Sequence, residues 1–421
     1  MDKNVRIVLC FLILMAFIIQ RKLTFNFLEN GGLNMWELSG KYAIVGVGES
    51  NRSKKSGTTP LHLALEAARN AIADSGLPRT EIDAIMSYNE GDSCTSHQVS
   101  TYLGIRPRYV KDIMSGGSST ELLIGDAVSL IESGQASSVL IFRAMNGRSG
   151  VRMGGGGWST DLLQTAIDGG SFIIPYGMAS PSQWFGMFAT RHMHEAGITK
   201  EDLGHVCVSL YEHAQRNPKA MLNGKPLTLE EYMETPYLSY PFTKHDFCLE
   251  TDEANAIIVT SAENAKRCTS RPVYIKGLVA RETHPHTHYW TDLEQVAADY
   301  VGEKIYESAD ITPDDLDVAA IYDCYSWVLM RQLEAYKIAP REKLSEFVAA
   351  GNLKIGGKLP TNTAGGMLSE GYTHGMNNVL EIVRQLRHEY EGTDRQVKDC
   401  EIGLCTGWLG PDAAGALVLN N

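Results

Sequence analysis

The sequence lacks three features that would define broad classes of protein: a net positive charge, paired cysteines and a hydrophobic run long enough to cross a bilayer. Among its 421 residues, 50 acidic side chains outnumber 38 basic ones, and the formal net charge of −12 argues against a nucleic-acid-binding surface. Eight cysteines are present, but they form no CxxC pair and no zinc-site spacing. Such a set is typical of reduced thiols, so we expect a cytoplasmic protein.

Common nucleotide, hydrolase and metal motifs are also absent. The first predicted strand ends in Gly46-Val-Gly48, but Asn51 stands where a dinucleotide-binding fingerprint needs its third glycine. No GxSxG nucleophile elbow occurs. Histidines alternate at 284, 286 and 288, and three imidazoles on one face of a strand could bind a metal. The intervening Pro285 favours a loop, so we expect no metal site.

An apolar run near the N-terminus is flanked by basic residues on both sides. It covers the 15 residues from Val5 to Ile19, fewer than the roughly 20 that a membrane-spanning helix needs. No small-residue cleavage site follows it, as a secretory signal would require. Met35 then begins MWELSGKYAIVGVGES, which is typical of the start of a cytosolic α/β domain. We expect residues 1–34 to be an extension outside the fold, with a membrane anchor as the alternative.

Residues 362–387 carry the main indication of a functional site. Tyr372 and His374 are held between Gly371 and Gly375, directly before a helix predicted from apolar positions 376, 379, 380, 383 and 386. Glycine permits a tight turn that a ligand can approach closely, and a helix N-terminus favours negative charge. We expect this turn to form one wall of an active site. An ordinary loop leading into a helix is the alternative.

The same arrangement occurs earlier in the chain, where Ser115-Gly-Gly-Ser-Ser119 precedes another amphipathic helix. Residues 76–85 also match residues 310–319, because each stretch follows a predicted helix and leads into a strand. No unit recurs at a period of 20–50 residues, so we infer a duplication at the scale of a domain. The predicted halves span 36–270 and 271–421, with a loop insertion at about 144–241 in the first.

Hydrophobic patterns predict alternating strands and helices in both halves. The expected elements are strands at 42–47, 84–88, 138–142, 256–260, 273–275, 401–405 and 416–419, and helices at 60–75 and 182–196. The second of these helices is the one element predicted inside the insertion. A turn is expected after Cys405. The fold class that follows is α/β, with the site between the paired helix starts of the two halves.

Four stretches carry a resemblance to a known family: PYG at 175–177, HAQRNPKA at 213–220, YDCYS at 322–326 and GGMLSEGYTHG at 365–375. From Trp36 to the C-terminus the chain resembles the thiolase superfamily, and more closely its thiolase-like lipid-transfer proteins, related to the thiolase part of sterol carrier protein X. The resemblance implies a five-layered αβαβα fold and a tight homodimer. It also implies an acyl-CoA substrate, with coenzyme A as part of that substrate and no other cofactor.

The resemblance also assigns site residues. Ordinary thiolases carry a nucleophilic cysteine before the first-half helix, and that position falls on Gly117, so the attacking thiol is missing. The family's asparagine falls on Tyr322, the phenylalanine three residues later on Tyr325, and the histidine of the glycine turn on Tyr372. The second family cysteine is matched by Cys405, which is either an acid/base or a small hydrophobe buried as a relic.

Without a thiol, the resemblance favours proton chemistry over acyl transfer, because acyl transfer needs a thiolate activated by a histidine. Ser118 and its serine neighbours could stand in, but no histidine remains at the activating position. Retro-aldol cleavage of a β-hydroxyacyl-CoA needs instead a base at the hydroxyl and an oxyanion site for the thioester enolate. The predicted bases are Tyr322 and Tyr372, with His374 helping to lower a tyrosine pKa.

Backbone N–H groups near Gly117 and Gly407 are the predicted oxyanion donors, and Ser118 and Tyr325 are expected to line the substrate site. The chain resembles thiolase-like aldolases that shorten steroid side chains together with a small OB-fold, zinc-ribbon protein, so a partner of that kind is expected. Two alternatives remain: a non-catalytic acyl-CoA or lipid carrier, and an acyltransferase similar to acetyl-CoA acetyltransferase.

Overall fold

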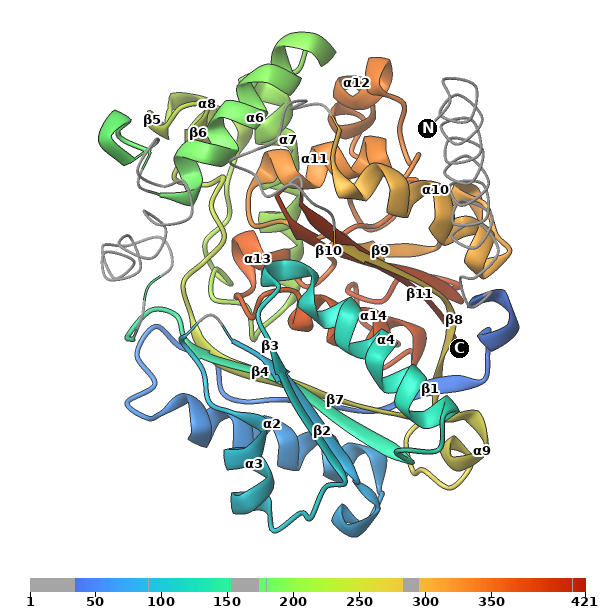
Figure 1. Ribbon diagram of the computed structural model, residues 1–421. Coiled ribbons are helices and arrows are strands. Elements are labelled where there is room, and N and C mark those ends of the chain that lie inside the picture. The colour runs from blue at the N-terminus through green and yellow to red at the C-terminus, as the bar shows by residue number, and fades with distance from the viewer. Residues whose placement is uncertain are drawn as a thin grey trace, which may run out of the picture.

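Nine strands of the described residues form one sheet, in the spatial order β3-β2-β4-β7-β1-β8-β11-β10-β9 (Figure 1). The computed structural model describes residues 35–421 except 90, 151, 153–173, 179, 283–294 and 411. The strands of this sheet are β1 (Tyr42–Glu49), β2 (Ala84–Tyr88), β3 (Tyr109–Ile113), β4 (Ser138–Asn146), β7 (Asp252–Ser261), β8 (Val273–Glu282), β9 (Val318–Ala320), β10 (Ile402–Leu409) and β11 (Ala413–Asn420).

The strand pairing repeats between the two halves of the chain. In the first half, β2 runs parallel to β4, and β7 is antiparallel to both β4 and β1. In the second half, β9 runs parallel to β10, and β11 is antiparallel to both β10 and β8. The halves meet where β1 and β8 pair through Ala43↔Tyr274 and Ile44↔Val273. The predicted duplication is therefore confirmed, because the same pairing extends outward from this junction on both sides.

Helices cover both groups of strands and fill the space between them, as Figure 1 shows. The helices that define these layers are α2 (Pro60–Ser75) and α3 (Ser96–Leu103) outside the first group, α4 (Ser119–Glu132) and α14 (Met376–Leu386) in the middle, and α10 (Ala297–Ala309) and α11 (Ser326–Ala335) outside the second group. Three separate hydrophobic clusters correspond to these three helical layers. The predicted five-layered αβαβα arrangement is confirmed.

Local sequence explains where helix α2 begins and ends and where helix α14 begins. Thr59 caps α2 by accepting a hydrogen bond from the backbone N–H of His62, and Pro60 occupies the first turn. Gly76 ends α2 in the left-handed conformation, with φ of 69°. Helix α14 starts after Gly375, whose φ of 97° is accessible mainly to glycine. Every apolar position predicted for α14 is buried.

The insertion contains more regular structure than the sequence predicted. Besides α6 (Pro181–Ala196), it holds α7 (Lys200–Arg216), α8 (Leu229–Glu234) and the hairpin of β5 (Tyr237–Ser239) and β6 (Phe242–Thr243). The expectation of a single helix there was wrong. Apolar positions 203, 206, 207, 210 and 214 of α7 are all buried and have helical spacing, but the polar residues between them obscured the pattern.

Cys405 also requires a correction, since the predicted turn after it is absent and residues 405–407 continue within β10, paired with β11. The chain turns later, near Gly410, whose φ is 55°. The short helices α9 (Ala262–Ala265), α12 (Leu344–Ala349) and α13 (Gly366–Ser369) complete the α-helices of the described residues.

Two predictions fall on residues that the structure does not describe: the extension at 1–34 and the alternating histidines at 284–288. Within the described ranges, no helix is long and apolar enough to cross a membrane. The same ranges hold no group of three or more histidine, cysteine or carboxylate side chains arranged to bind a metal ion. The domain boundary at 270/271 stays a prediction.

Candidate active site

Two buried tyrosines from the second half of the chain meet hydroxyl to hydroxyl. Tyr322 follows β9, and Tyr372 lies in the glycine turn between α13 and α14. Their hydroxyl oxygens are 3.1 Å apart. The side chains are 2% and 7% exposed, so water has little access to the pair. The Tyr322 backbone is fixed as well, because its N–H donates to Thr406 Oγ1 at 3.0 Å and its carbonyl accepts from Gln332 at 2.7 Å.

The Tyr322 ring occupies the space in which a side chain at position 117 would lie. A Cβ atom added to Gly117 would come within 3.0 Å of ring carbons Cζ and Cε2 and of the hydroxyl oxygen. Gly375 packs on the same ring, and its added Cβ would lie 3.4 Å from Cδ2. The resemblance places the thiolase nucleophile at Gly117. In this chain a tyrosine ring therefore fills the volume where a cysteine side chain would otherwise project.

The serines beside Gly117 bond to their own turn. Ser118 Oγ donates to the Ser115 carbonyl at 2.9 Å, and Ser119 Oγ donates to the Gly116 carbonyl at 2.8 Å. Neither hydroxyl contacts a histidine among the described residues. Because a serine needs an adjacent base to attack a thioester, this geometry does not favour serine acyl transfer. The two hydroxyls instead hold the turn that leads into α4.

His374 lies beside Tyr372 and faces a buried ion pair. Its ring centroid is 5.1 Å from that of Tyr372, and its Nδ1 is 3.3 Å from Nη2 of Arg143. Arg143 in turn contacts Asp92 through Nη1–Oδ1 at 2.9 Å and Nη2–Oδ2 at 2.7 Å. Burial and the charge of Arg143 lower the pKa of His374 to about 3, so its imidazole is neutral at pH 7.

Arg143 and Asp92 were not predicted from the sequence. Arg143 lies in β4, which the sequence presents only as a buried apolar strand, and Asp92 lies in the loop that follows β2. The sequence did offer one signal, an arginine in the middle of an apolar strand. Charged residues are almost never fully buried unless they are paired, so this arginine indicated a buried acidic partner.

Burial raises the pKa of both tyrosines well above 10, so both are protonated in the unliganded site. Cys248 and Cys324 lie close enough to raise the two values further. Two groups act in the opposite direction on Tyr372: a hydrogen bond from Tyr322 and the charge of Arg143 both favour its ionised form. The neighbours that favour an ionised phenol therefore act on Tyr372, although burial keeps both phenols protonated.

Gly117 and Gly407, near which the oxyanion donors are predicted, lie against each other. A Cβ added to Gly407 would lie 2.7 Å from the Gly117 carbonyl oxygen and closer still to Oε2 of Glu121, so β10 passes directly against the start of α4. Glu121 was missed by the sequence analysis. It is 1% exposed, and burial raises its pKa to about 8. Its carboxyl group is therefore largely protonated at pH 7, beside the predicted oxyanion donors.

Cys405 and Tyr325 lie in apolar surroundings. Cys405 projects from β10 into the middle layer, where its Sγ is 3.7 Å from the Asn378 carbonyl oxygen and burial raises its pKa. Tyr325 packs among three phenylalanines, with ring centroids 4.8 Å from Phe185, 4.9 Å from Phe242 and 5.3 Å from Phe247. These surroundings favour a hydrophobic wall over proton transfer for Tyr325. An acid/base role for Cys405 stays a prediction.

A buried ionic network supports the turn that carries Tyr372. Arg52 contacts Glu253 through Nε and lies 3.4 Å from Glu370. A Cβ added to Gly371 would clash with this Arg52–Glu253 pair, so the peptide before Tyr372 rests directly on it. Arg52 also donates to the Lys219 carbonyl at 3.0 Å, which joins the turn to the motif at 213–220.

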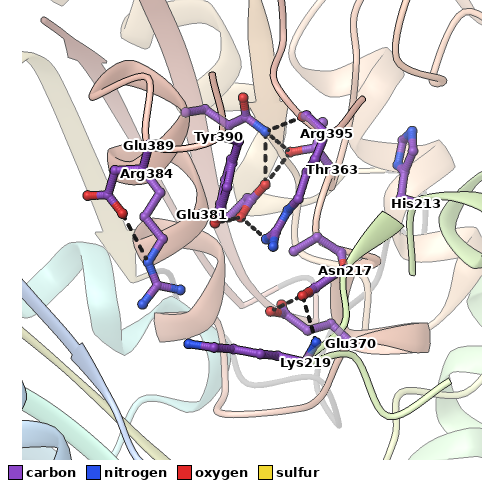
Figure 2. A network of polar contacts seen from close by, with 12 residues as sticks. His213, Asn217, Lys219, Thr363, Glu370, Glu381, Arg384, Glu389, Tyr390 and Arg395 are labelled. Atoms are coloured by element: carbon purple, nitrogen blue, oxygen red, sulfur yellow. Dashed lines mark hydrogen bonds and ion pairs between the residues drawn. The ribbon is translucent and has the colours of Figure 1, made fainter. Parts of the chain in front are cut away.

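That motif anchors residues 362–370, as Figure 2 shows for Asn217 and Glu370. Asn217 Nδ2 donates to the Ala364 carbonyl at 3.0 Å and to Glu370 at 3.3 Å. His213 Nδ1 lies 3.2 Å from the Asn362 carbonyl. Along α14, Glu381 accepts from Thr363 at 2.6 Å and pairs with Arg395 (Figure 2). The motif that carried part of the resemblance therefore positions the segment that leads into the turn carrying Tyr372.

A separate groove of about 710 Å³ lies along α6 and β5. Tyr176, Met187 and Tyr240 line it, and all three are exposed. Neither Tyr322 nor Tyr372 contributes to its lining. The chemistry-bearing groups therefore gather at the buried tyrosine pair and not at this groove.

Comparison with known proteins agrees with this architecture. Residues 280–420 match the family described as thiolase C-terminal domain-like. A steroid side-chain-cleaving aldolase from Thermomonospora curvata is 36% identical over 391 residues, covering 90% of this chain and 98% of that protein. A 17-hydroxy-3-oxo-4-pregnene-20-carboxyl-CoA lyase from Mycobacterium tuberculosis is 37% identical over 392 residues, covering 90% and 100%.

Solved structures give the same result. The structure of an Ltp2–ChsH2(DUF35) aldolase superposes with a TM-score of 0.83 at 33% identity, covering 91% of this chain and 98% of that chain. Human mitochondrial 3-ketoacyl-CoA thiolase, at 14% identity and a TM-score of 0.67, shares the fold alone. The chain therefore belongs to the thiolase superfamily, in the branch that contains the steroid side-chain-cleaving aldolases.

Proposed function

We propose that the protein cleaves a β-hydroxyacyl-CoA by a retro-aldol reaction at the tyrosine pair. The observation that carries this proposal is the contact between the Tyr322 and Tyr372 hydroxyls at 3.1 Å, with the Tyr322 ring packed against Gly117. A thiolase needs a thiol side chain at position 117, whereas in this chain the phenol of Tyr322 fills that space and contacts a second phenol, Tyr372. The relatives that are 36% and 37% identical are named as an aldolase and a CoA lyase, which supports the same reaction class.

The reaction needs one base and returns its proton. Tyr372 is protonated in the unliganded site, so the reaction proceeds through its minor ionised form, which the hydrogen bond from Tyr322 and the charge of Arg143 stabilise. This phenolate accepts the proton of the substrate β-hydroxyl. The Cα–Cβ bond then breaks, the β-carbon becomes the carbonyl carbon of a ketone or aldehyde, and the electron pair moves into the thioester enolate. Protonation of the enolate at Cα by Tyr372 releases the shortened acyl-CoA and restores the base, so no cofactor or covalent intermediate is required.

The enolate oxygen needs hydrogen-bond donors. Backbone N–H groups near Gly117 and Gly407 are the proposed donors, supported by the direct approach of these two glycines. Donors held by a rigid backbone stabilise developing charge without reorganising during the reaction. The protonated carboxyl group of Glu121 keeps a negative charge away from this oxygen at pH 7, because its pKa is raised to about 8.

The substrate that we propose is a polycyclic β-hydroxyacyl-CoA. The name of the Mycobacterium tuberculosis relative describes such a compound, because its hydroxyl-bearing carbon neighbours the carbon that carries the carboxyl-CoA group. The relative from Thermomonospora curvata is named for steroid side-chain cleavage. The aromatic cluster around Tyr325 is apolar and lies three residues from Tyr322, which supports an apolar substrate.

We also propose a homodimer and a small OB-fold, zinc-ribbon partner in the cytoplasm. Strand β3 is an edge of the sheet, with Val110 43% exposed and the adjacent Met114 72% exposed, so a second copy could pair there. The similar solved structure is named as an Ltp2–ChsH2(DUF35) assembly, which supports the partner. All seven cysteines of the described residues are free, which fits a reducing compartment.

The test is an assay of the full chain, with and without a co-expressed OB-fold partner, on a β-hydroxyacyl-CoA and a β-ketoacyl-CoA. Tyr372→Phe should reduce retro-aldol turnover by about 10²–10⁴-fold, because it removes the base, while calorimetric substrate affinity stays unchanged. Tyr306→Phe is the control, since it removes another buried hydroxyl bond, at 2.6 Å from the Tyr336 carbonyl, in the outer layer. It should retain wild-type turnover.

The other outcomes either identify a different function or refute the proposed base. Thiolysis of the β-ketoacyl-CoA would mean that a thiol acts as nucleophile, and Cys248 and Cys324 beside the tyrosines would be the candidates. Binding of both thioesters without product, in the presence of the partner, would mean a carrier. Wild-type retro-aldol turnover in Tyr372→Phe would refute the proposed base.

A further inference from the structure

The guanidinium group of Arg143 is held rigidly inside the protein. Its side chain is 0% exposed, and both Nη atoms contact the Asp92 carboxylate. Nη1 also donates to the Tyr88 and Ala144 carbonyls, both at 3.3 Å. These contacts fix the direction of Nη2, which lies 3.3 Å from Nδ1 of His374.

This contact determines where the imidazole of His374 carries its proton. A guanidinium group has donors and no acceptor, so Nδ1 must accept the hydrogen bond and cannot be protonated. The neutral ring therefore holds its single proton on Nε2. The ring is also fixed from the backbone side, because the His374 carbonyl accepts from the Tyr88 hydroxyl at 3.0 Å and the residue adopts φ of 54°.

The Nε2–H group has no hydrogen-bond partner among the described residues, and the ring lies 5.1 Å from that of Tyr372. In the proposed reaction Tyr372 contacts the β-hydroxyl of the substrate. The remaining acceptor at the reacting centre is the thioester oxygen, on which negative charge develops. A neutral donor suits this oxygen, because an acidic imidazolium would protonate the phenolate base beside it.

We propose that His374 is a catalytic residue whose Nε2–H donates to the thioester oxygen of the acyl-CoA and stabilises the enolate, with Arg143 and Asp92 as positioning residues that hold this tautomer. The inference rests on the proposed function and deepens it. It differs from the role expected from the sequence, in which His374 lowers a tyrosine pKa. Here the histidine is an oxyanion donor alongside the backbone of Gly117 and Gly407.

Two substitutions separate a donor at Nε2 from a structural role. In His374→Gln the amide nitrogen can take the place of Nε2, whereas in His374→Asn it reaches only the position of Nδ1. We expect His374→Gln to keep kcat within about tenfold of wild type and His374→Asn to lose about 10²–10³-fold, the effect of removing one oxyanion donor. A structural role predicts the opposite order, because asparagine tolerates a φ of 54° better than glutamine does.

Nitrogen NMR of the ¹⁵N-histidine-labelled full chain tests the tautomer without any turnover. At pH 7 the His374 signals, assigned by their loss in His374→Gln, should show an unprotonated Nδ1 and a protonated Nε2. The double substitution Arg143→Met with Asp92→Asn removes the ion pair without leaving a lone charge. In the otherwise wild-type protein, this double substitution should give a mixture of the two His374 tautomers and a lower kcat. In the His374→Asn variant, the same double substitution should cause no further loss of kcat.

A protonated Nδ1, or a His374→Asn variant as active as His374→Gln, would overturn the inference. Failure of the proposed function looks different. In that case the wild-type protein would not cleave the β-hydroxyacyl-CoA at all, whatever tautomer the NMR experiment reports.

Discussion

The substitution Gly117→Ala tests whether the Tyr322 ring occupies the space that the nucleophilic cysteine fills in ordinary thiolases. The added methyl group would lie within 3.0 Å of three atoms of Tyr322. The ring must move by on the order of 1 Å to reach ordinary carbon contact distances of about 3.5–4.0 Å. Gly117 lies outside the positive-φ residues, so alanine adds no backbone strain there and the clash is the dominant effect.

Both stability and turnover should respond. Forcing a methyl group into a packed core costs about 1–3 kcal/mol, and a catalytic group displaced by about 1 Å loses about 10²-fold in rate. We expect kcat for retro-aldol cleavage to fall by that factor, with a lower urea midpoint. Gly125→Ala is the matched control on α4. The nearest atom to its added methyl is a flexible Leu278 Cδ2 at 3.3 Å, so it should keep wild-type kcat.

A double-substitution cycle separates this clash from other effects. In the Tyr322→Ala background the ring is gone, so adding Gly117→Ala should no longer reduce stability. Activity would stay lost, because the phenol is missing. If Gly117→Ala alone keeps wild-type kcat and stability, or if it destabilises the Tyr322→Ala protein to the same extent as the wild type, the steric argument is wrong.

Two further predictions concern buried charges. Burial raises the pKa of Glu121 from 4.5 to about 8, so the unfolded state binds fewer protons between these values and the free energy of unfolding falls as pH rises through this window. Urea midpoints measured at pH 5 and pH 8 should show that Glu121→Gln gains stability relative to wild type at the higher pH. The same midpoint difference between variant and wild type at both pH values would contradict this. Arg52→Met should cost about 3–5 kcal/mol by leaving Glu253 and Glu370 buried without their cation. Adding Glu253→Gln to Arg52→Met should recover part of the decrease in the urea midpoint. A further decrease in the midpoint would refute the pairing of Arg52 with Glu253.

Much of the framework was predictable because it depends on local patterns. Strand β2 occupies the predicted residues 84–88, and α2 occupies the predicted 60–75. Period-two and period-3.6 apolar spacing arises from burial of one face of an element, so it is visible in the sequence before any tertiary contact is known. The matched stretches at 76–85 and 310–319 likewise indicated the duplication that the strand pairing confirms.

The sequence also identified both tyrosines and Gly117, through the family positions that they occupy. It could not show that the three are in contact, because they lie 205 and 50 residues apart along the chain. Likewise it left His374 with a general role, since the tautomer depends on a guanidinium group 231 residues away.

The tertiary structure alone decided which charged groups surround the site. Arg52, Asp92, Glu121 and Arg143 lie in separate segments of the first half, and none belongs to a motif that signals its partner. Their protonation states depend on burial and on neighbours that folding brings within a few ångströms, and both quantities are absent from a linear pattern. The sequence by itself therefore determined the architecture and the candidate phenols, whereas the burial and neighbouring charges that set their protonation exist only in the folded protein.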